Sequence, residues 1–259
     1  MSSRELHGYV AMSRAELRLF RREPFSIVFV LAFPLMMMML LAAVFGNDPE
    51  SADDIENGML IWRGVTPADY YTAASVAAVI AALGLLTLPV NLAGYRERGI
   101  LRRMRASSVP AWVVVAAQLT LAVITFLAGA LVMAVVARFG YDATMPDDVI
   151  GVVVALLVGA LAFGSIGLLL AALVRGSRAA QGIGLMLFFS LWLISGTAPP
   201  RAVLPSTVRD IGGLLPLSHL VTAIQDPWFG AGWSFDHLAA LVAYAIGAGI
   251  PALYFFRWD

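Results

Sequence analysis

Cysteine and lysine are both missing from this 259-residue chain, and charged residues make up only 13% of it. Without cysteine, disulfides, thiol nucleophiles and thiolate metal sites are excluded. Without lysine, a Walker A phosphate loop is excluded, because its lysine reaches the nucleotide phosphates. The net charge is zero, which argues against nucleic acid as a partner. Since a soluble domain averages about 25% charged residues, the composition predicts a membrane protein.

Six apolar stretches are long enough to cross a bilayer, whose core of about 30 Å needs about 20 helical residues. None of them contains Asp, Glu, Lys or Arg. They are residues 26–46, 70–92, 111–137, 149–174, 179–198 and 238–256. The pattern predicts an all-α integral membrane fold in which residues 1–259 form a single domain with six transmembrane helices.

Arginine is distributed unevenly among the segments that connect these stretches. Thirteen of the 17 arginines lie in segments on one side of the predicted membrane, namely 1–25, 93–110, 175–178 and 257–259. Four lie on the other side, namely Arg63, Arg138, Arg201 and Arg209. Arginine-rich loops stay in the cytoplasm. We therefore expect a multi-pass protein of the plasma membrane with both termini in the cytoplasm.

Residues 1–25 are polar and rich in arginine, and within them 5–23 have an amphipathic pattern. Leu6, Val10 and Leu17 recur at helical spacing, opposite Arg14 and Arg18. A basic, weakly hydrophobic helix of this kind lies in the membrane interface, and we predict an interfacial helix here. The alternative is a cluster of arginines that only sets the topology.

The loop 93–110 is too patterned for a simple connector. Helical ion pairs form between residues three or four apart, and Glu97 has no basic residue at those positions. Its counter-charge is therefore expected on another segment or another chain. Leu101 and Met104 form a small apolar face among arginines, which predicts a short amphipathic helix on the cytoplasmic side. The alternative is a positively charged anchor.

Residues 199–222 are apolar, yet they cannot form one continuous span. Pro199 and Pro200 are expected to end the fifth apolar stretch, and further prolines and glycines interrupt the leucines that follow. Non-helical backbone at membrane depth survives only when it is buried in protein or faces a water-filled cavity. We predict a re-entrant external hairpin of two short helices before the last span, with a plain external loop as the alternative.

Three motifs in these segments resemble the permease subunit of ABC type-2 exporters of the daunorubicin-resistance kind. Residues 95–105 read YRERGILRRMR and resemble the cytoplasmic pattern ERE-x-G-T-L-x-R-L-R of that family. Phe33-Pro34-Leu35 lies inside the first span, and the LP…LPL-x-H pattern is matched by residues 204–205 and 215–219. Tyr95 replaces the first Glu, Ile100 replaces the usual Thr, and Ser108 stands where Pro is common.

The resemblance implies a half-transporter. Two permeases, identical or paralogous, would surround a central pathway, and each would dock on a cytoplasmic ABC ATPase subunit. ATP and Mg would be bound by that partner, so this chain would carry no cofactor and no catalytic site of its own. The implied contact with the ATPase is the coupling segment, whose residues are Arg96, Glu97, Arg98, Gly99, Leu101, Arg102, Arg103, Met104 and Arg105.

Substrate contacts are expected among polar, aromatic and methionine side chains within the spans, because polar groups are costly in a membrane and methionine adapts to varied ligands. The candidates are Met37, Thr87, Asn91, Phe188, Phe189, Trp192 and Ser195. Helix packing is the alternative role for each of them. The apolar spans favour a hydrophobic or amphipathic small molecule as cargo, such as a drug, an antibiotic or a lipid, which would give a function in multidrug or antibiotic resistance.

Two other classes of protein share some of these features. Six spans with Ser165 in the fourth and His237 beside the sixth resemble the layout of a rhomboid-like intramembrane serine protease, although no glycine directly follows the serine. A membrane scaffold without transport activity is the second alternative. Metalloprotease chemistry is excluded because the chain has no H-E-x-x-H motif, and no metal site is expected.

Overall fold

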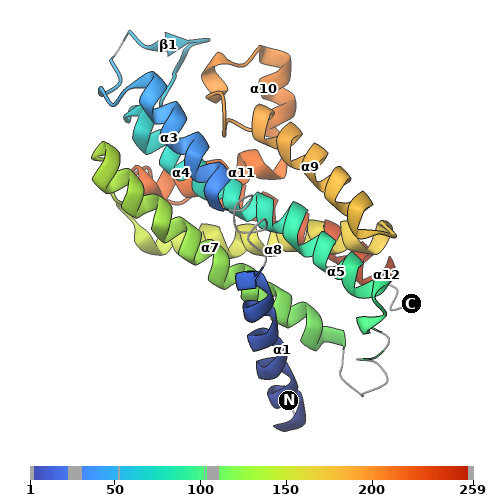
Figure 1. Ribbon diagram of the computed structural model, residues 1–259. Coiled ribbons are helices and arrows are strands. Elements are labelled where there is room, and N and C mark those ends of the chain that lie inside the picture. Colours follow the sequence, from blue (N-terminus) through green and yellow to red (C-terminus); the bar gives the residue numbers. More distant parts are fainter. Residues whose placement is uncertain (1–2, 23–30, 52, 102, 104–110, 256–259) are drawn as a thin grey trace.

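The computed structural model describes residues 3–22, 31–51, 53–101, 103 and 111–255. Within these residues the secondary structure is helical apart from one two-stranded antiparallel hairpin, β1 (Ile55–Glu56) and β2 (Met59–Leu60). Among the described residues, five helices are long and apolar enough to cross a membrane. Figure 1 shows them as an elongated bundle. The all-α architecture expected from the sequence is confirmed.

Every predicted apolar stretch corresponds to a helix. These helices are α3 (Phe33–Phe45), the continuous run of α4 (Pro67–Ala82), η2 (Leu83–Thr87) and α5 (Leu88–Glu97), then α7 (Ala111–Tyr141), α8 (Val149–Leu173), α9 (Ser177–Ile194) and α12 (Phe235–Phe255). The helix α3 has 13 residues, too few to span a bilayer alone. The predicted start of that first span lies in 23–30, outside the described residues, so the six-span count stays a prediction.

The α4–η2–α5 run lies at the centre of the molecule. It contacts α3, α7, α8, α9 and α11, and every residue of α4 is buried. Thr66 caps its start by accepting a hydrogen bond from the Asp69 backbone N–H at 3.2 Å, and Pro67 occupies the first turn, where its missing N–H costs nothing. In the middle, η2 is π-helical, which adds a residue to the turn.

Glycine lets α8 approach this central helix closely. A Cβ built on Gly84 would lie 2.6 Å from the carbonyl oxygen of Phe163 and 2.7 Å from its Cβ. On the facing helix, a Cβ on Gly167 would overlap the carbonyl oxygen of Gly84. Small residues of this kind let two backbones pack in direct contact within a membrane. The π-helical segment is therefore fixed against α8 by backbone contact.

The helix predicted within residues 1–25 is present as α1 (Ser3–Arg22), and residues 23–25 lie outside the described part of the chain. It packs against α7, where the hydroxyls of Tyr9 and Thr120 lie 2.6 Å apart. Val10 and Leu17 remain exposed. These two side chains leave an apolar face available to lipid, as the proposed interfacial position requires.

Two short helices follow α9, as predicted, after the 3₁₀ turn η3 (Arg201–Val203): α10 (Ser206–Gly213) and α11 (Pro216–Trp228). The prediction that Pro199 and Pro200 end the fifth helix is wrong. The helix already ends at Ile194, because Gly196 adopts a φ of +85° that a helix cannot continue. α11 is buried against α4, α8 and α12. The depth of this segment in a membrane stays a prediction.

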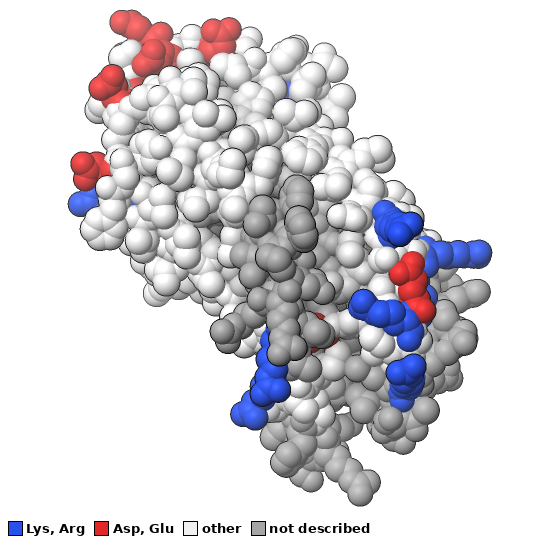
Figure 2. Space-filling view, in the orientation of Figure 1, with Lys and Arg blue, Asp and Glu red and all other residues white. Residues whose placement is uncertain are grey.

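Charged side chains gather at the two ends of the bundle. Figure 2 shows acidic residues around β1 and the end of α3, and arginines around α1, α5 and the start of α9. Between the two ends the visible face of the described residues is almost uncharged. This is the pattern of a protein whose middle lies in a membrane. The described arginine-rich segments thus lie together at one end, and which side of the membrane that end faces stays a prediction.

Candidate coupling site

The segment predicted as one coupling helix is divided by a turn. Arg96 and Glu97 are the last residues of α5, and Gly99 follows with a φ of +65°. This left-handed conformation suits glycine and ends a helix. Ile100, Leu101 and Arg103 are helical again. The second span therefore reaches further than its apolar residues indicate, and the short helix predicted around Leu101 begins only after Gly99.

Leu101 belongs to a small apolar cluster beneath this turn. Its side chain is completely buried against a cluster that includes Leu92 and Tyr95 of α5 and Ala171 of α8. The apolar face predicted for this segment is thus confirmed at Leu101. The other predicted members, Met104 with Arg102 and Arg105, lie outside the described residues.

Arg96 binds the carboxyl end of α8. Its Nη1 donates hydrogen bonds to the carbonyl oxygens of Ala171 at 3.1 Å and Val174 at 3.2 Å. The last carbonyl groups of a helix lack partners within the helix and carry partial negative charge. The guanidinium therefore supplies both the missing donors and a charge of the favourable sign.

Glu97 binds the amino end of α9, the next helix in the chain. Its Oε1 accepts a hydrogen bond from the Ser177 backbone N–H at 3.0 Å, and its Oε2 accepts one from the Ser177 hydroxyl at 2.7 Å. The partner lies on another segment, as predicted, but these two groups are neutral. These hydrogen bonds, at the partly positive start of a helix, lower the pKa of the Glu97 carboxyl most, and the positive charges of Arg178 and Arg98 lower it further.

These two neighbouring residues thus hold both sides of the short turn that joins α8 to α9. The turn is tight, since a Cβ on Gly176 would lie 3.0 Å from Glu97 Oε1. Each side chain has the charge that its helix end favours. The end of α5 is therefore joined by hydrogen bonds to both α8 and α9. We call Arg96, Glu97 and the turn 174–176 the α8–α9 clamp.

A buried polar cluster connects the same end of α5 to α1 and α7. The Tyr95 hydroxyl donates to Glu16 Oε1 at 2.6 Å, and Gln118 Nε2 donates to the Tyr95 hydroxyl at 3.5 Å. Glu16 is only 1% exposed. Sequence reasoning placed α1 at the lipid interface and missed this contact. The available signal was the spacing of Tyr9, Ser13 and Glu16, which places three polar side chains on one helical face.

Exposed arginines surround the α8–α9 clamp. Arg98, Arg103, Arg175 and Arg178 are all exposed, and Figure 2 shows arginines gathered at this end with an acidic residue among them. Arg98 also lies over the ring of Tyr95, 5.7 Å from its centre, a cation–π contact that orients it. The exposed surface beside the clamp is therefore basic.

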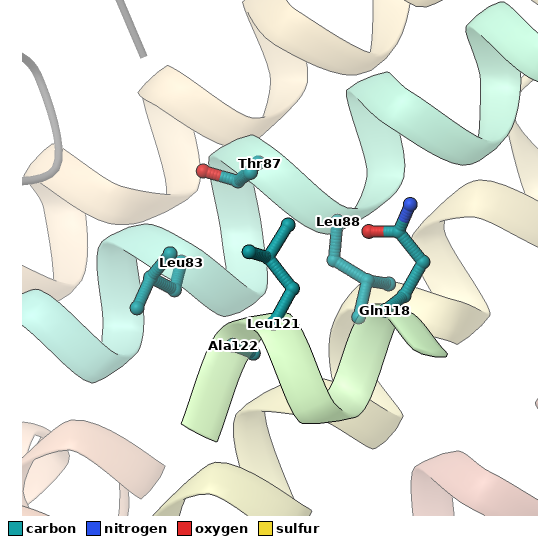
Figure 3. A pocket seen from close by; sticks show the side chains of 6 residues that line it. All are labelled: Leu83, Thr87, Leu88, Gln118, Leu121 and Ala122. Atoms are coloured by element: carbon teal, nitrogen blue, oxygen red, sulfur yellow. The ribbon is translucent and has the colours of Figure 1, made fainter. Parts of the chain in front are cut away.

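Among the predicted substrate contacts, Thr87 borders a cavity between η2, α5 and α7. In Figure 3, Leu121 reaches from α7 toward the helix that carries Leu83, Thr87 and Leu88. The cavity volume is about 10 Å³. That is room for about one water molecule, whereas small-molecule sites measure about 300–1,000 Å³. This cavity is too small for a cargo molecule.

Three other predicted contacts form one aromatic cluster with a residue of α3. The Phe33 ring centre lies 6.3 Å from that of Phe188, 5.5 Å from Phe189 and 5.9 Å from Trp192. Phe188 is buried, whereas Phe189 is 37% exposed. Ser195 is completely buried, and its hydroxyl lies 2.8 Å from that of Thr197. The remaining candidates, Met37 and Asn91, are half-buried.

Ser165 and His237 are not neighbours, so the protease hypothesis is wrong. The Ser165 hydroxyl lies against Gly249, because a Cβ on that glycine would be 3.3 Å from it. Gly249 is 12 residues beyond His237 on the same helix, which is about 18 Å at 1.5 Å per residue. His237 Nδ1 instead lies 2.8 Å from Nδ1 of His219.

Comparison with known proteins settles the family. The family model of the ABC-2 type transporter matches residues 7–229, which is most of the chain. The chain belongs to the ABC-2 type transporter family. No match was found among curated proteins. Membrane domains of ABC-2 type transporters are permease components, so this chain is a multi-pass membrane protein of a transport family, which favours a transport permease over the scaffold alternative.

Proposed function

We propose that this ABC-2 permease is driven by a separate cytoplasmic ABC ATPase, which contacts the basic surface beside the α8–α9 clamp. The observation that carries the proposal is the clamp itself. Arg96 and Glu97 tie the end of α5 to both α8 and α9, so a push on residues 98–105 reaches three helices at once. Arginine makes bidentate contacts with carboxylates, which suits an acidic groove on the ATPase.

The proposed topology places this basic end and both termini in the cytoplasm of a bacterial cell. ATP and Mg would act on the partner subunit, and closure of a pair of ATPases would move the coupling segment. Two permeases, identical or paralogous, would form the pathway between them. The first span would be completed by residues that precede α3, giving six spans, with residues 199–222 entering the membrane from outside.

The proposed direction is export, and the proposed cargo is a hydrophobic or amphipathic small molecule. The aromatic cluster of Phe33, Phe188, Phe189 and Trp192 supports this, because it joins α3 to α9 and leaves Phe189 exposed. Aromatic rings bind apolar molecules with large contact area. A second permease facing this surface would enclose a site that one chain leaves open.

The test separates coupling from docking. Glu97→Ala removes both contacts with Ser177 and leaves the exposed arginines in place, so transport should be abolished while the ATPase still co-purifies. Arg98→Glu together with Arg103→Glu reverses the exposed charge, so the ATPase should no longer co-purify. Glu56→Ala removes an exposed carboxylate at the opposite end of the molecule and is the matched control, expected to behave as wild type in both assays.

Transport is measured as efflux of a fluorescent amphipathic dye from cells, and docking as the amount of ATPase that co-purifies with the permease. Expression and membrane insertion are checked for each variant. If Glu97→Ala exports at the wild-type rate, the clamp does not transmit movement. If the arginine reversals keep both the ATPase and export, residues 96–105 only anchor the loop.

A further inference from the structure

A second site lies at the opposite end of the molecule from the α8–α9 clamp. A cavity of about 540 Å³ opens between the β2 hairpin, the start of α4, η3, α10 and α11. Arg63, Arg201 and Arg209 all line it. These are three of the four arginines found outside the arginine-rich segments. The fold therefore places three of the four arginines of this end in one cavity, although they are far apart in the sequence.

Arg63 is bound to two neighbouring residues of α11, Gln225 and Asp226. Its Nη2 forms an ion pair with Asp226 at 2.5 Å, and its Nη1 donates to Gln225 Oε1 at 2.9 Å. Because the side-chain oxygen of Gln225 accepts this hydrogen bond from Arg63, its side-chain nitrogen remains available to donate to another group. Gln225 is only 2% exposed, and its Nε2 interacts with the Tyr70 hydroxyl but completes no hydrogen bond of ordinary geometry among the described residues. Buried polar groups are rarely left unsatisfied.

Arg209 presents a second donor of the same kind. Its Nη1 is buried and has no acceptor in the described part of the chain. Arg201 is positioned by two glycines, since a Cβ on Gly196 would lie 2.6 Å from its Cγ and one on Gly213 would lie 2.9 Å from its Nη2. The backbone therefore leaves space for this guanidinium on both sides. The described residues that line the cavity include no carboxylate.

The charge and size of the cavity select one class of ligand. Three guanidinium groups and the adjacent Asp226 leave a net charge of about +2, which a phosphate monoester neutralises with its charge of about −1.5 to −2 at pH 7. A carboxylate would neutralise only half of it. Planar arginine groups bind phosphate oxygens bidentately. Met59, Leu60 and Ala202 add apolar wall, so the cavity has room for more than a bare phosphate.

We propose that this cavity binds a phosphate-bearing anion, with Arg201, Arg209 and the Gln225 amide as its donors and Arg63 holding that amide in place. The proposal concerns this chain alone and does not depend on the ATPase or on the direction of transport. The phosphate group belongs either to a lipid headgroup or to a soluble phosphate ester, and titration with one compound of each kind distinguishes the two sources.

The test measures the thermal stability of the complete chain, purified from membranes in detergent with any subunit that accompanies it. Three compounds are titrated: dihexanoyl phosphatidic acid, glycerol phosphate, and dihexanoyl phosphatidylcholine, which has no net charge. Phosphatidic acid should raise the unfolding temperature and phosphatidylcholine should not. If glycerol phosphate acts at the same concentrations, the ligand is a soluble phosphate ester; if it needs far higher concentrations, the ligand is a lipid.

Two variants test the residues. Gln225→Glu keeps the size of the side chain and the acceptor for Arg63 but places a carboxylate where the anion would lie. Arg209→Gln removes the guanidinium whose Nη1 has no acceptor in the described part of the chain. Each should weaken the response to phosphatidic acid by about 10-fold or more, as expected for losing a charge-assisted hydrogen bond. Arg138→Gln is the matched control, because Arg138 pairs with Asp142 at 3.0 Å and is half-exposed, outside the cavity.

The proposal is overturned if phosphatidic acid gives no stabilisation, or if phosphatidylcholine stabilises equally. It is also overturned if Gln225→Glu and Arg209→Gln both respond like wild type, or if Arg138→Gln loses the response to the same extent. If one of Gln225→Glu and Arg209→Gln fails to fold, the response of the other variant to phosphatidic acid decides, because the two substitutions are independent.

Discussion

Replacing Gly84 by alanine is the most direct test of the contact that fixes the π-helical segment. The added Cβ would lie 2.6 Å from the Phe163 carbonyl oxygen and 2.7 Å from its Cβ. Neither atom can rotate away, so α8 and η2 must separate by several tenths of an ångström. Overpacking of this kind costs about 1–3 kcal/mol. The higher helix propensity of alanine returns about 1 kcal/mol, so the expected net loss is about 0–2 kcal/mol.

Gly247→Ala isolates the packing part of this effect. Gly247 lies on α12 with no heavy atom near the position of its missing Cβ, so this variant should gain about 1 kcal/mol from helix propensity alone. The two variants should therefore differ by about 1–3 kcal/mol. In a chain of this size 1 kcal/mol shifts the unfolding temperature by about 2–4 °C. Equal unfolding temperatures, measured in detergent, would refute the claim of backbone contact between α8 and η2.

Three further predictions follow from the topology and from the histidine pair. In intact cells, which have no cysteine background from this chain, Ser51→Cys should react with an impermeant maleimide and Arg175→Cys should not; the reverse would invert the topology. Leu214 is 71% exposed, and if α10 lies in lipid, Leu214→Cys should react faster with a lipid-soluble maleimide than with a charged one. Burial and the adjacent His237 lower the pKa of His219, so the unfolded chain binds more protons and stability should fall as the pH drops below about 6.5. His219→Gln should flatten this dependence in thermal unfolding at pH 5–8, and an unchanged slope would exclude His219 as its source.

The helical spans could be predicted closely from the sequence. A helix in lipid needs a long run of uncharged residues, and such runs occur in this chain only in the six predicted stretches. The predicted stretch 70–92 became a helix over 67–97 because polar residues can continue a helix beyond the apolar core. The early end at Ile194 was hidden for a different reason. A single glycine at 196 ended the helix before the more conspicuous prolines.

The partners of the charged residues could not be predicted from periodicity. The spacing of Glu97 excluded a partner on its own helix, which was correct, but the sequence offered only charged residues as candidates. The partner is the N-terminus of α9, a group that every helix has and that no residue code marks. Glu16 was hidden in the same way, since its partner Tyr95 is 79 residues away along the chain.

The π-helical turn determines the direction in which the end of the central helix points. One additional residue in a helix rotates everything beyond it by about 100° relative to an uninterrupted α-helix. Residues 83–87 therefore determine how far Arg96 and Glu97, at the end of the central helix, are rotated about its axis relative to Asp69 at its start. If this turn straightened into an ordinary α-helix with all its residues kept, the two charged side chains would turn roughly a quarter of a revolution away from the ends of α8 and α9. The π-helical geometry of this turn, more than the identity of its leucines, therefore keeps Arg96 and Glu97 directed at the ends of α8 and α9.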